Sequence, residues 1–363
     1  MNVLFVDLDR EWRGGQSQAL LTLNGLVQNG HEATLAAAEH SPIAVRAAKD
    51  GITVQEIPQR GLRFRAVTAI RRLILQNKFD VLHLNEPHAM SAAWLAGAHN
   101  HLPLLLSRRI GFPLRKNWFS QSSYRAITRF IANSENVAAS LVASGISKEK
   151  VAVVNEGVEL PSPTSLEMRN AGRAFWKVNG DEFLFGCVSV FVPEKGQRHV
   201  IEALAEVRSS APRARLLLAG DGASRRELQS LTKRLGLVDA VIFPGFVQNV
   251  DQIYRALDAF VFPSEFEGLG TALQTAMAYE LPCISTARGA LAEVVEPNRT
   301  ALVVEPDAKE FARAMLRLIG DANLRCQLGS AGRQEVAERF SAERMVENTI
   351  RVYEEVVREG WNK

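Results

Sequence analysis

Short apolar segments alternate with helix-like segments along almost the whole chain of 363 residues. In the first half, the segments that predict strands are residues 3–6, 32–36, 53–57, 81–84, 104–106, 129–132 and 151–154. After a polar stretch the alternation resumes, with predicted strands at residues 184–190, 214–219, 240–243, 259–262, 282–285 and 301–304. Strands that alternate with helices form parallel sheets with helical crossovers. The chain therefore predicts an α/β fold.

The polar stretch in the middle of the chain predicts a linker between two domains. It covers residues 156–172, and a chain of 363 residues is long enough for two domains of ordinary size. We expect an N-terminal domain at residues 1–158, a second domain at residues 173–340, and a last helix within 341–363 that packs back on the first domain. Both domains are expected to be doubly wound. Ligands of such folds bind beyond the carboxyl ends of the strands, so two facing domains would enclose a cleft.

Composition narrows the class of protein. The chain is 47% hydrophobic and 23% charged, as in globular proteins, and no apolar run approaches the roughly 20 residues that span a bilayer. Residues 1–7 lack the basic start and cleavage site of a secretory signal, so we expect a cytoplasmic protein. The cysteines, Cys187, Cys283 and Cys326, show no metal-ligand spacing and are expected to be buried thiols. A net charge of +3 is too small to indicate nucleic acid.

Two stretches of the first half carry basic residues and no acidic ones. Residues 59–78 contain Arg60, Arg63, Arg65, Arg71, Arg72 and Lys78. Residues 107–129 contain Arg108, Arg109, Arg115, Lys116, Arg125 and Arg129, interleaved with Phe112, Trp118, Phe119 and Tyr124. Basic residues beside aromatic ones suit an anionic membrane surface or a phosphorylated, lipid-linked substrate. An ordinary solvated face with some core aromatics is the open alternative.

Residues 263–278 combine a glycine-containing turn with the start of a helix, directly after a predicted strand. A helix N-terminus presents unpaired N–H groups and attracts anions. Gly268 and Gly270 allow close approach of a ligand, and Glu267 offers a carboxylate to sugar hydroxyls. The segment predicts a site for an anionic, hydroxyl-rich ligand. An exposed turn glutamate beside purely structural glycines explains it equally well.

Four other turns also follow predicted strands: Gly14 and Gly15 before a predicted helix at residues 17–26, Ser189 to Gly196, Gly220 to Gly222, and Phe243 to Val247. The two glycines at the first turn fit a tight loop close to a phosphate or sugar. Lys195 can neutralise a diphosphate leaving group, and the backbone at residues 243–247 can read the edge of a base. Each turn also fits a structural role alone.

In this order, five motifs resemble the GT-B retaining glycosyltransferases of family 4: Arg13-Gly14-Gly15, Val192-Pro193-Glu194-Lys195-Gly196, Gly220-Asp221-Gly222, Phe243-Pro244-Gly245-Phe246 and Pro263-Ser264 to Ala278. The resemblance implies two Rossmann-like doubly wound domains facing a cleft. It also implies sugar transfer from a nucleotide-sugar donor without a bound metal or other cofactor. The C-terminal domain would hold the donor and the N-terminal domain the acceptor.

The resemblance also assigns roles to single residues. Lys195 matches the diphosphate lysine of the family, and Glu267 matches its first glutamate, which contacts the donor sugar. The implied donor-binding residues are Gly14, Gly15, Ser189, Lys195, Gly220, Phe246, Val247, Glu267, Gly268, Leu269, Gly270, Thr271, Ala272 and Thr275. The implied catalytic residues are Glu267 and Lys195, together with Arg108 and Arg109.

Three positions depart from the family pattern. Thr275 replaces the second glutamate, which binds ribose hydroxyls, and Val190 replaces the arginine of a Gly-Arg pair that clamps phosphate. Residues 106–110 lack the usual histidine. Arg108 or Arg109 would supply the charge lost at Val190, or else the activity has changed or been lost. The arginine pair also fits the solvated basic face.

The leading hypothesis is a glycosyltransferase of cell-envelope polysaccharide biosynthesis, with UDP as the expected donor nucleotide. Its acceptor would be a saccharide or a lipid-linked saccharide, and peripheral contact with the inner face of the membrane follows from the basic stretches. The alternatives are a non-catalytic nucleotide-binding or scaffold protein on the same fold, and a nucleotide-sugar epimerase.

Overall fold

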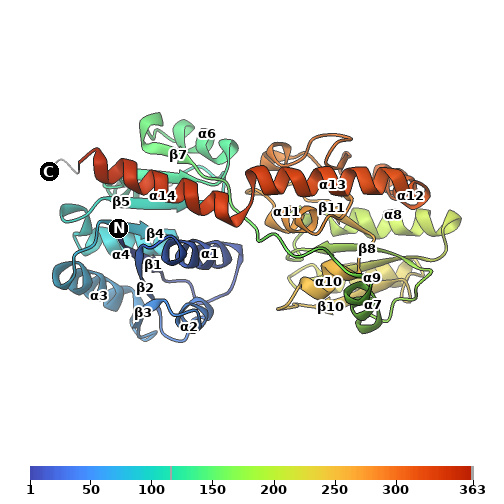
Figure 1. Ribbon diagram of the computed structural model, residues 1–363, viewed down its shortest axis with the longest axis horizontal. Helices are drawn as coiled ribbons and strands as arrows, with labels where there is room; N and C mark the ends of the chain where they lie inside the picture. The colour runs from blue at the N-terminus through green and yellow to red at the C-terminus, as the bar shows by residue number, and fades with distance from the viewer. Residues whose placement is uncertain (115–116, 361–363) are drawn as a thin grey trace. The chain divides into compact units, whose positions relative to one another are not determined.

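The computed structural model describes residues 1–114 and 117–360, which form two compact units (Figure 1). The first unit comprises Met1–Gly157 and the C-terminal segment from Ala342, and the second comprises Val158–Ser341. Each unit contains one sheet in which every strand pair is parallel. Both sheets have helical crossovers, and the α/β expectation is confirmed.

The sheet of the first unit has seven strands in the order β3-β2-β1-β4-β5-β6-β7. The strands are β1 Asn2–Asp7, β2 Glu32–Ala38, β3 Thr53–Ile57, β4 Val81–Leu84, β5 Leu104–Arg108, β6 Arg129–Ala132 and β7 Val151–Val153. The helices are α1 Gly14–Gln28, α2 Pro42–Lys49, α3 Leu62–Gln76, α4 Pro87–Leu95, α5 Trp118–Arg125, α6 Glu135–Ala143 and α14 Ala342–Arg358, with 3-10 turns η1 Ala98–Asn100 and η2 Lys148–Lys150.

The sheet of the second unit has six strands in the order β10-β9-β8-β11-β12-β13. The strands are β8 Phe183–Val188, β9 Ala214–Ala219, β10 Val241–Gly245, β11 Ala259–Phe262, β12 Cys283–Ser285 and β13 Leu302–Val303. The helices are α7 Leu166–Phe175, α8 Gln197–Ser210, α9 Arg225–Arg234, α10 Asp251–Ala256, α11 Thr271–Ala278, α12 Ala308–Gly320 and α13 Ala322–Arg339, with 3-10 turns η3 Pro193–Lys195 and η4 Gly289–Glu293.

Both faces of each sheet are buried, which explains why the strands are continuous apolar runs. In β1, Leu4 and Val6 point into one hydrophobic cluster while Val3 and Phe5 point into another. The first cluster lies under α3, α4 and α6, and the second lies under α1, α2 and α14. Among the residues that the structure describes, no helix combines the length and apolarity needed to cross a membrane.

The segment expected to be a linker is partly helical. Residues 166–175 form α7, and two arginines of this helix, Arg169 and Arg173, both bind Asp258 at the start of β11. Arg173 is 5% exposed and also donates to the carbonyl oxygen of Glu182 at 2.6 Å. The arginines of this polar stretch therefore attach it to the sheet of the second unit through Asp258. The second unit accordingly begins at Val158 and not at residue 173.

Helix α14 packs closely on α1 within the first unit. Gly25 of α1 is the contact point, because a Cβ atom placed there would lie 2.3 Å from Cγ2 of Val346. Met345, Val352, Tyr353 and Val356 of α14 are buried in the same cluster as β1. The C-terminal helix therefore completes the core of the first unit.

Replacing Gly25 with leucine should lower the free energy of unfolding by about 2 kcal/mol, because the β-branched side chain of Val346 has little freedom to move away. Urea unfolding, followed by circular dichroism, measures this change. Gly180→Leu is the control, since no heavy atom lies within 4 Å of a Cβ at that position. Equal stability of the Gly25 variant and the wild type would contradict this packing.

Candidate functional site

The turn that carries Lys195 lies directly against the turn that carries Glu267. Gly196 ends η3 with a φ of 64°, and a Cβ atom there would lie 2.3 Å from the carbonyl oxygen of Pro263. Only glycine fits this combination of positive φ and close approach. The two turns follow β8 and β11, which are neighbours in the sheet.

Lys195 and Glu267 form an ion pair across these turns. The Nζ atom of Lys195 binds Oε1 of Glu267 and donates to the carbonyl oxygen of Phe266 at 3.2 Å. The two side chains are 17% and 14% exposed. The pair is therefore largely desolvated, so loss of either partner would leave an uncompensated charge.

Helix α11 begins at Thr271, four residues after Glu267. Gly270 is its N-cap residue, and Thr271 and Ala272 of its first turn are half-buried. The first turn of a helix presents N–H groups that have no partner within the helix, and these favour an anion. Residues 268–272 thus place backbone donors next to the Lys195–Glu267 pair.

Thr275 lies in the second turn of α11. Its hydroxyl donates to the carbonyl oxygen of Thr271 at 2.8 Å, while the hydroxyl of Tyr254 donates to Ala272 O at 3.2 Å. The proton of Thr275 is therefore already used within the helix. This residue can offer a ligand only an acceptor.

The turns after β8, β9 and β10 meet at the same edge of the sheet. A Cβ atom on Gly220, whose φ is 141°, would lie 1.9 Å from the carbonyl oxygen of Ser189. Arg225 joins the next pair of turns, with Nη1 at 3.4 Å from Gly220 O and Nη2 at 3.4 Å from Phe243 O. Phe246 follows this strand end and is 67% exposed.

The structure thus brings together, within the second unit, most of the residues that the sequence predicts for the donor. They are Ser189, Lys195, Gly220, Phe246, Val247, Glu267, Gly268, Leu269, Gly270, Thr271, Ala272 and Thr275. The sequence analysis missed Arg225 and Gln197, which bond to these turns. Gln197 directly follows the predicted turn that ends at Gly196, and Arg225 lies three residues after the one that ends at Gly222. These positions are the only features of the sequence that could have identified them.

The remaining predicted residues belong to the first unit. Gly14 and Gly15 are the first two residues of α1, whereas the sequence predicted a loop before a helix starting at residue 17. Arg13 is the N-cap, and its side chain makes no capping hydrogen bond. A Cβ on Gly15 would lie 3.8 Å from the side chain of Arg109, so these predicted positions are neighbours.

The two arginines after β5 make different contacts. Arg109 pairs with Glu156, with Nε at 2.9 Å from Oε1, and donates from Nη1 to Asn85 O at 3.1 Å. Arg108 donates from Nη2 to Phe112 O at 2.7 Å, and burial lowers the pKa of its guanidinium. The charge of Arg109 is therefore offset by a carboxylate.

Two acidic residues, the buried Asp7 and the half-buried Glu86, lie at the same edge of the first unit and were not predicted. Asp7 accepts hydrogen bonds from Gln16 and Asn85, and burial raises its pKa. Burial also raises the pKa of Glu86 to about 7, and its carboxylate caps α4 by accepting from Ala89 N at 2.7 Å. Asp7 is the last residue of β1, and Glu86 lies two residues after the end of β4. An acidic residue at the end of an apolar run is a signal that the sequence contains.

No group of three or more histidine, cysteine and acidic residues suited to a metal ion occurs in the described part of the chain. Cys187 and Cys283 are buried, as predicted. The prediction is wrong for Cys326, which is exposed because it lies on the outer side of α13.

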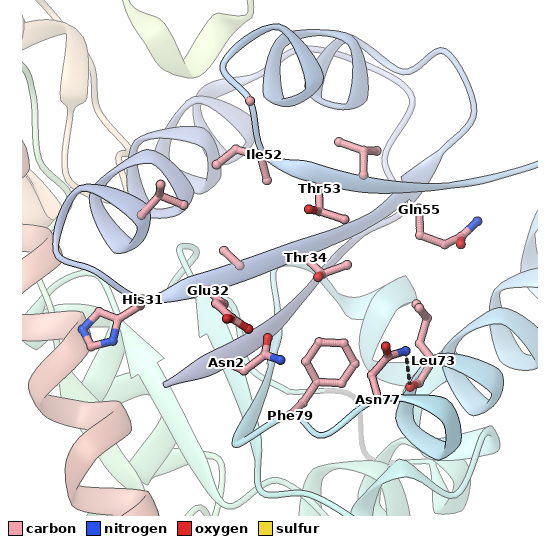
Figure 2. Close-up of a pocket in the computed structure, with 14 residues that line it drawn as sticks. Asn2, His31, Glu32, Thr34, Ile52, Thr53, Gln55, Leu73, Asn77 and Phe79 are labelled. Atoms are coloured by element: carbon pink, nitrogen blue, oxygen red, sulfur yellow. Dashed lines mark hydrogen bonds between the residues drawn. The ribbon is translucent and has the colours of Figure 1, made fainter.

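A cavity of about 480 Å³ in the first unit is separate from these residues. Its lining includes Asn2, Glu32 and Thr53 at the amino ends of β1, β2 and β3, as Figure 2 shows. Ligands of parallel sheets bind at the carboxyl ends. None of the predicted site residues lines this cavity.

Two family models match different parts of the chain. The model for glycosyl transferases group 1 matches residues 168–335, and the model for glycosyltransferase family 4 matches residues 12–161. The chain is 26% identical to the putative glycosyltransferase EpsD of Bacillus subtilis over 342 residues. This alignment covers 90% of each chain. It is 28% identical to the lipopolysaccharide core biosynthesis glycosyltransferase LpsD of Rhizobium meliloti, over 77% of this chain and 78% of the relative.

Solved structures show the same fold over the full length. A glycosyltransferase from Rickettsia africae has a TM-score of 0.86 and 19% identity, with 99% of each chain covered. HepE of Anabaena, in complex with UDP and glucose, has a TM-score of 0.84 and 21% identity, with 98% of this chain and 99% of that chain covered. The chain has the GT-B fold and belongs to glycosyltransferase family 4, whose members transfer a sugar from a nucleotide-sugar donor.

Proposed function

We propose that the second unit binds a UDP-sugar and that the enzyme transfers the sugar to a saccharide or lipid-linked saccharide of the cell envelope. The transfer retains the anomeric configuration of the sugar and needs no metal ion. The single observation that carries the donor site is the Lys195–Glu267 pair beside the first turn of α11. One solved structure of HepE contains UDP with glucose and another contains UDP-glucose, and both favour uracil as the base of the donor. The name of LpsD supports an envelope acceptor.

The site contains complementary groups for the two ends of a sugar diphosphate. Lys195 supplies a cation to the diphosphate, and the backbone N–H groups of Gly268 to Ala272 supply neutral donors. When the C1–O bond of the donor breaks, negative charge develops on the diphosphate and these groups stabilise it. Glu267, released from Lys195, would accept hydrogen bonds from the sugar hydroxyls.

Arg108 and Arg109 stay proposed as contacts of the diphosphate. The proximity of Arg109 to Gly15 at the start of α1 supports this role. Glu156 offsets the charge of Arg109 just as Glu267 offsets that of Lys195, but the proposed donor turns belong to the second unit, so Arg109 should contribute less than Lys195.

Lys195→Ala should lower turnover about 100-fold or more, because it removes one charged stabiliser of the leaving group. Glu267→Gln should lower it to a similar degree, and Arg109→Ala should lower it less. Release of nucleoside diphosphate from UDP-, GDP- and ADP-sugars, with acceptors extracted from the cell envelope, measures turnover. Activity in EDTA equal to that with added Mg²⁺ is expected for a metal-independent enzyme.

The matched controls for this assay are Lys233→Ala and Glu227→Gln, which change exposed residues of α9. Full activity of the Lys195 and Glu267 variants would contradict the proposed site. Binding of nucleotide without transfer would favour a scaffold protein, and a changed sugar in the absence of acceptor would indicate an epimerase. Loss of activity in EDTA would contradict metal independence.

We also propose that the first unit contacts an anionic membrane at its cytoplasmic side. The two acid-free stretches predicted from the sequence contain α3 and α5, and both of these helices pack on α4. We name as the basic–aromatic surface the exposed residues Arg63, Phe64, Arg65, Arg71, Arg72 and Trp118. Arg115 and Lys116 lie outside the described residues.

Large aromatic side chains project from this surface. Phe64 is 83% exposed and Trp118 is 76% exposed, although Trp118 makes an edge contact with Trp94 of α4. Aromatic rings flanked by arginines suit the interface of a membrane with anionic lipids.

Replacing Arg63 and Arg65 together with glutamate should weaken binding to vesicles that contain 30% phosphatidylglycerol at least about 10-fold, since each basic residue near an anionic surface contributes about 1 kcal/mol. Co-sedimentation at rising salt measures this binding. The control is Arg351→Glu with Arg358→Glu, two exposed residues of α14. Equal binding of both double variants, or equal binding to neutral vesicles, would contradict the proposal.

A further inference from the structure

Gln197 is a buried residue of the second unit that the proposed donor contacts do not use. It is the first residue of α8 and is 2% exposed. Its Nε2 atom lies 2.9 Å from the carbonyl oxygen of Val190 and 2.8 Å from Oγ of Ser189. The amide therefore binds the two residues that directly follow β8.

These contacts fix the direction of each hydrogen bond. A backbone carbonyl only accepts, so the atom of Gln197 that faces Val190 O must be the nitrogen. The same nitrogen faces Ser189 Oγ, which must then act as the acceptor. The hydroxyl proton of Ser189 is consequently directed toward a different acceptor.

The described residues offer Ser189 only a weak alternative partner. Its Oγ lies 3.7 Å from Sγ of Cys187, and burial raises the pKa of that thiol to about 12. The thiol therefore stays protonated at neutral pH, and a thiol sulfur is a poor acceptor. Ser189 itself is half-buried at this edge of the sheet.

Ser189 also lies close to the turn that carries Lys195. Gln197, which binds Ser189, follows Lys195 by two residues. Ser189 and Val190 occupy the positions at which the family resemblance places a Gly-Arg pair. The chain thus has a hydroxyl donor next to the site where it lacks an arginine.

We propose that Ser189 donates its hydroxyl proton to a phosphate oxygen of the donor diphosphate, and that Gln197 is the positioning residue that holds the hydroxyl in this orientation. The assignment rests on the proposed donor site. It explains how the site retains a phosphate donor after β8 although Val190 has no charge. A neutral hydroxyl stabilises a diphosphate less than a guanidinium does, but it still makes a charge-assisted hydrogen bond.

The test compares binding of UDP with binding of uridine, which lacks the phosphates, by calorimetry on the full chain. Ser189→Ala and Gln197→Leu should each weaken UDP binding about 10-fold, the usual loss for a hydrogen bond to a charged group, and leave uridine binding unchanged. Gln197→Glu should weaken UDP binding as well, because a carboxylate accepts the proton of Ser189 and turns it away from the phosphate.

The double variant separates positioning from mere support of the fold. Since both substitutions remove the same contact, Ser189→Ala with Gln197→Leu should bind UDP no more weakly than either single variant. The matched controls are Ser210→Ala and Gln229→Leu, which change exposed residues of α8 and α9 and should match the wild type.

Three results would overturn the assignment: unchanged UDP binding by Ser189→Ala, an equal loss of uridine and UDP binding, or additive losses in the double variant. Ser189→Ala keeps the test decisive if Gln197→Leu fails to fold. If the wild type binds GDP or ADP in place of UDP, the same comparison uses that nucleotide and its nucleoside. Failure of the wild type to bind any of the three would instead refute the donor site, and the assignment with it.

Discussion

The ion pair between Lys195 and Glu267 connects the two turns that form the donor end of the second unit. Neither side chain would tolerate this degree of burial alone, because an isolated charge in a largely desolvated position costs several kcal/mol. The pair forms because Gly196 lets its turn approach the backbone of Pro263. In the free protein each residue therefore holds the other in position, and a sugar diphosphate must replace this mutual contact with its own.

Ser189 and Gln197 are a second pair in which one residue holds the other in position, and here the residue held is a neutral hydrogen-bond donor. Within the second unit, Lys195 supplies charge, the first turn of α11 supplies backbone N–H groups, and Ser189 supplies a hydroxyl whose direction is set by a neighbour. The corresponding edge of the first unit is different in character. There Arg109 is paired with Glu156, and the buried Asp7 and the half-buried Glu86 are acids with raised pKa values. The second unit thus adds neutral hydrogen-bond donors beside its ion pair, whereas the first unit adds acids.

The sequence predicted the strands well because a parallel strand that is buried on both faces must be apolar throughout. It also located Lys195 and Glu267, since each follows such a strand. It failed where polar residues are held by partners that are distant in sequence. Arg169 lies in the stretch predicted as a linker, yet it binds Asp258, and Gln197 was not predicted to have a role. Gly14 and Gly15 were predicted to form a tight loop close to a phosphate or sugar, yet they belong to the first turn of α1.

A crystal structure of the chain with UDP tests the donor site most directly. We expect a phosphate oxygen about 2.7–3.2 Å from Nζ of Lys195 and from a backbone nitrogen of the α11 first turn, with Lys195 no longer bound to Glu267. A diphosphate bound elsewhere, or one bound at α11 while the Lys195–Glu267 pair stays intact, would contradict the role assigned to this pair.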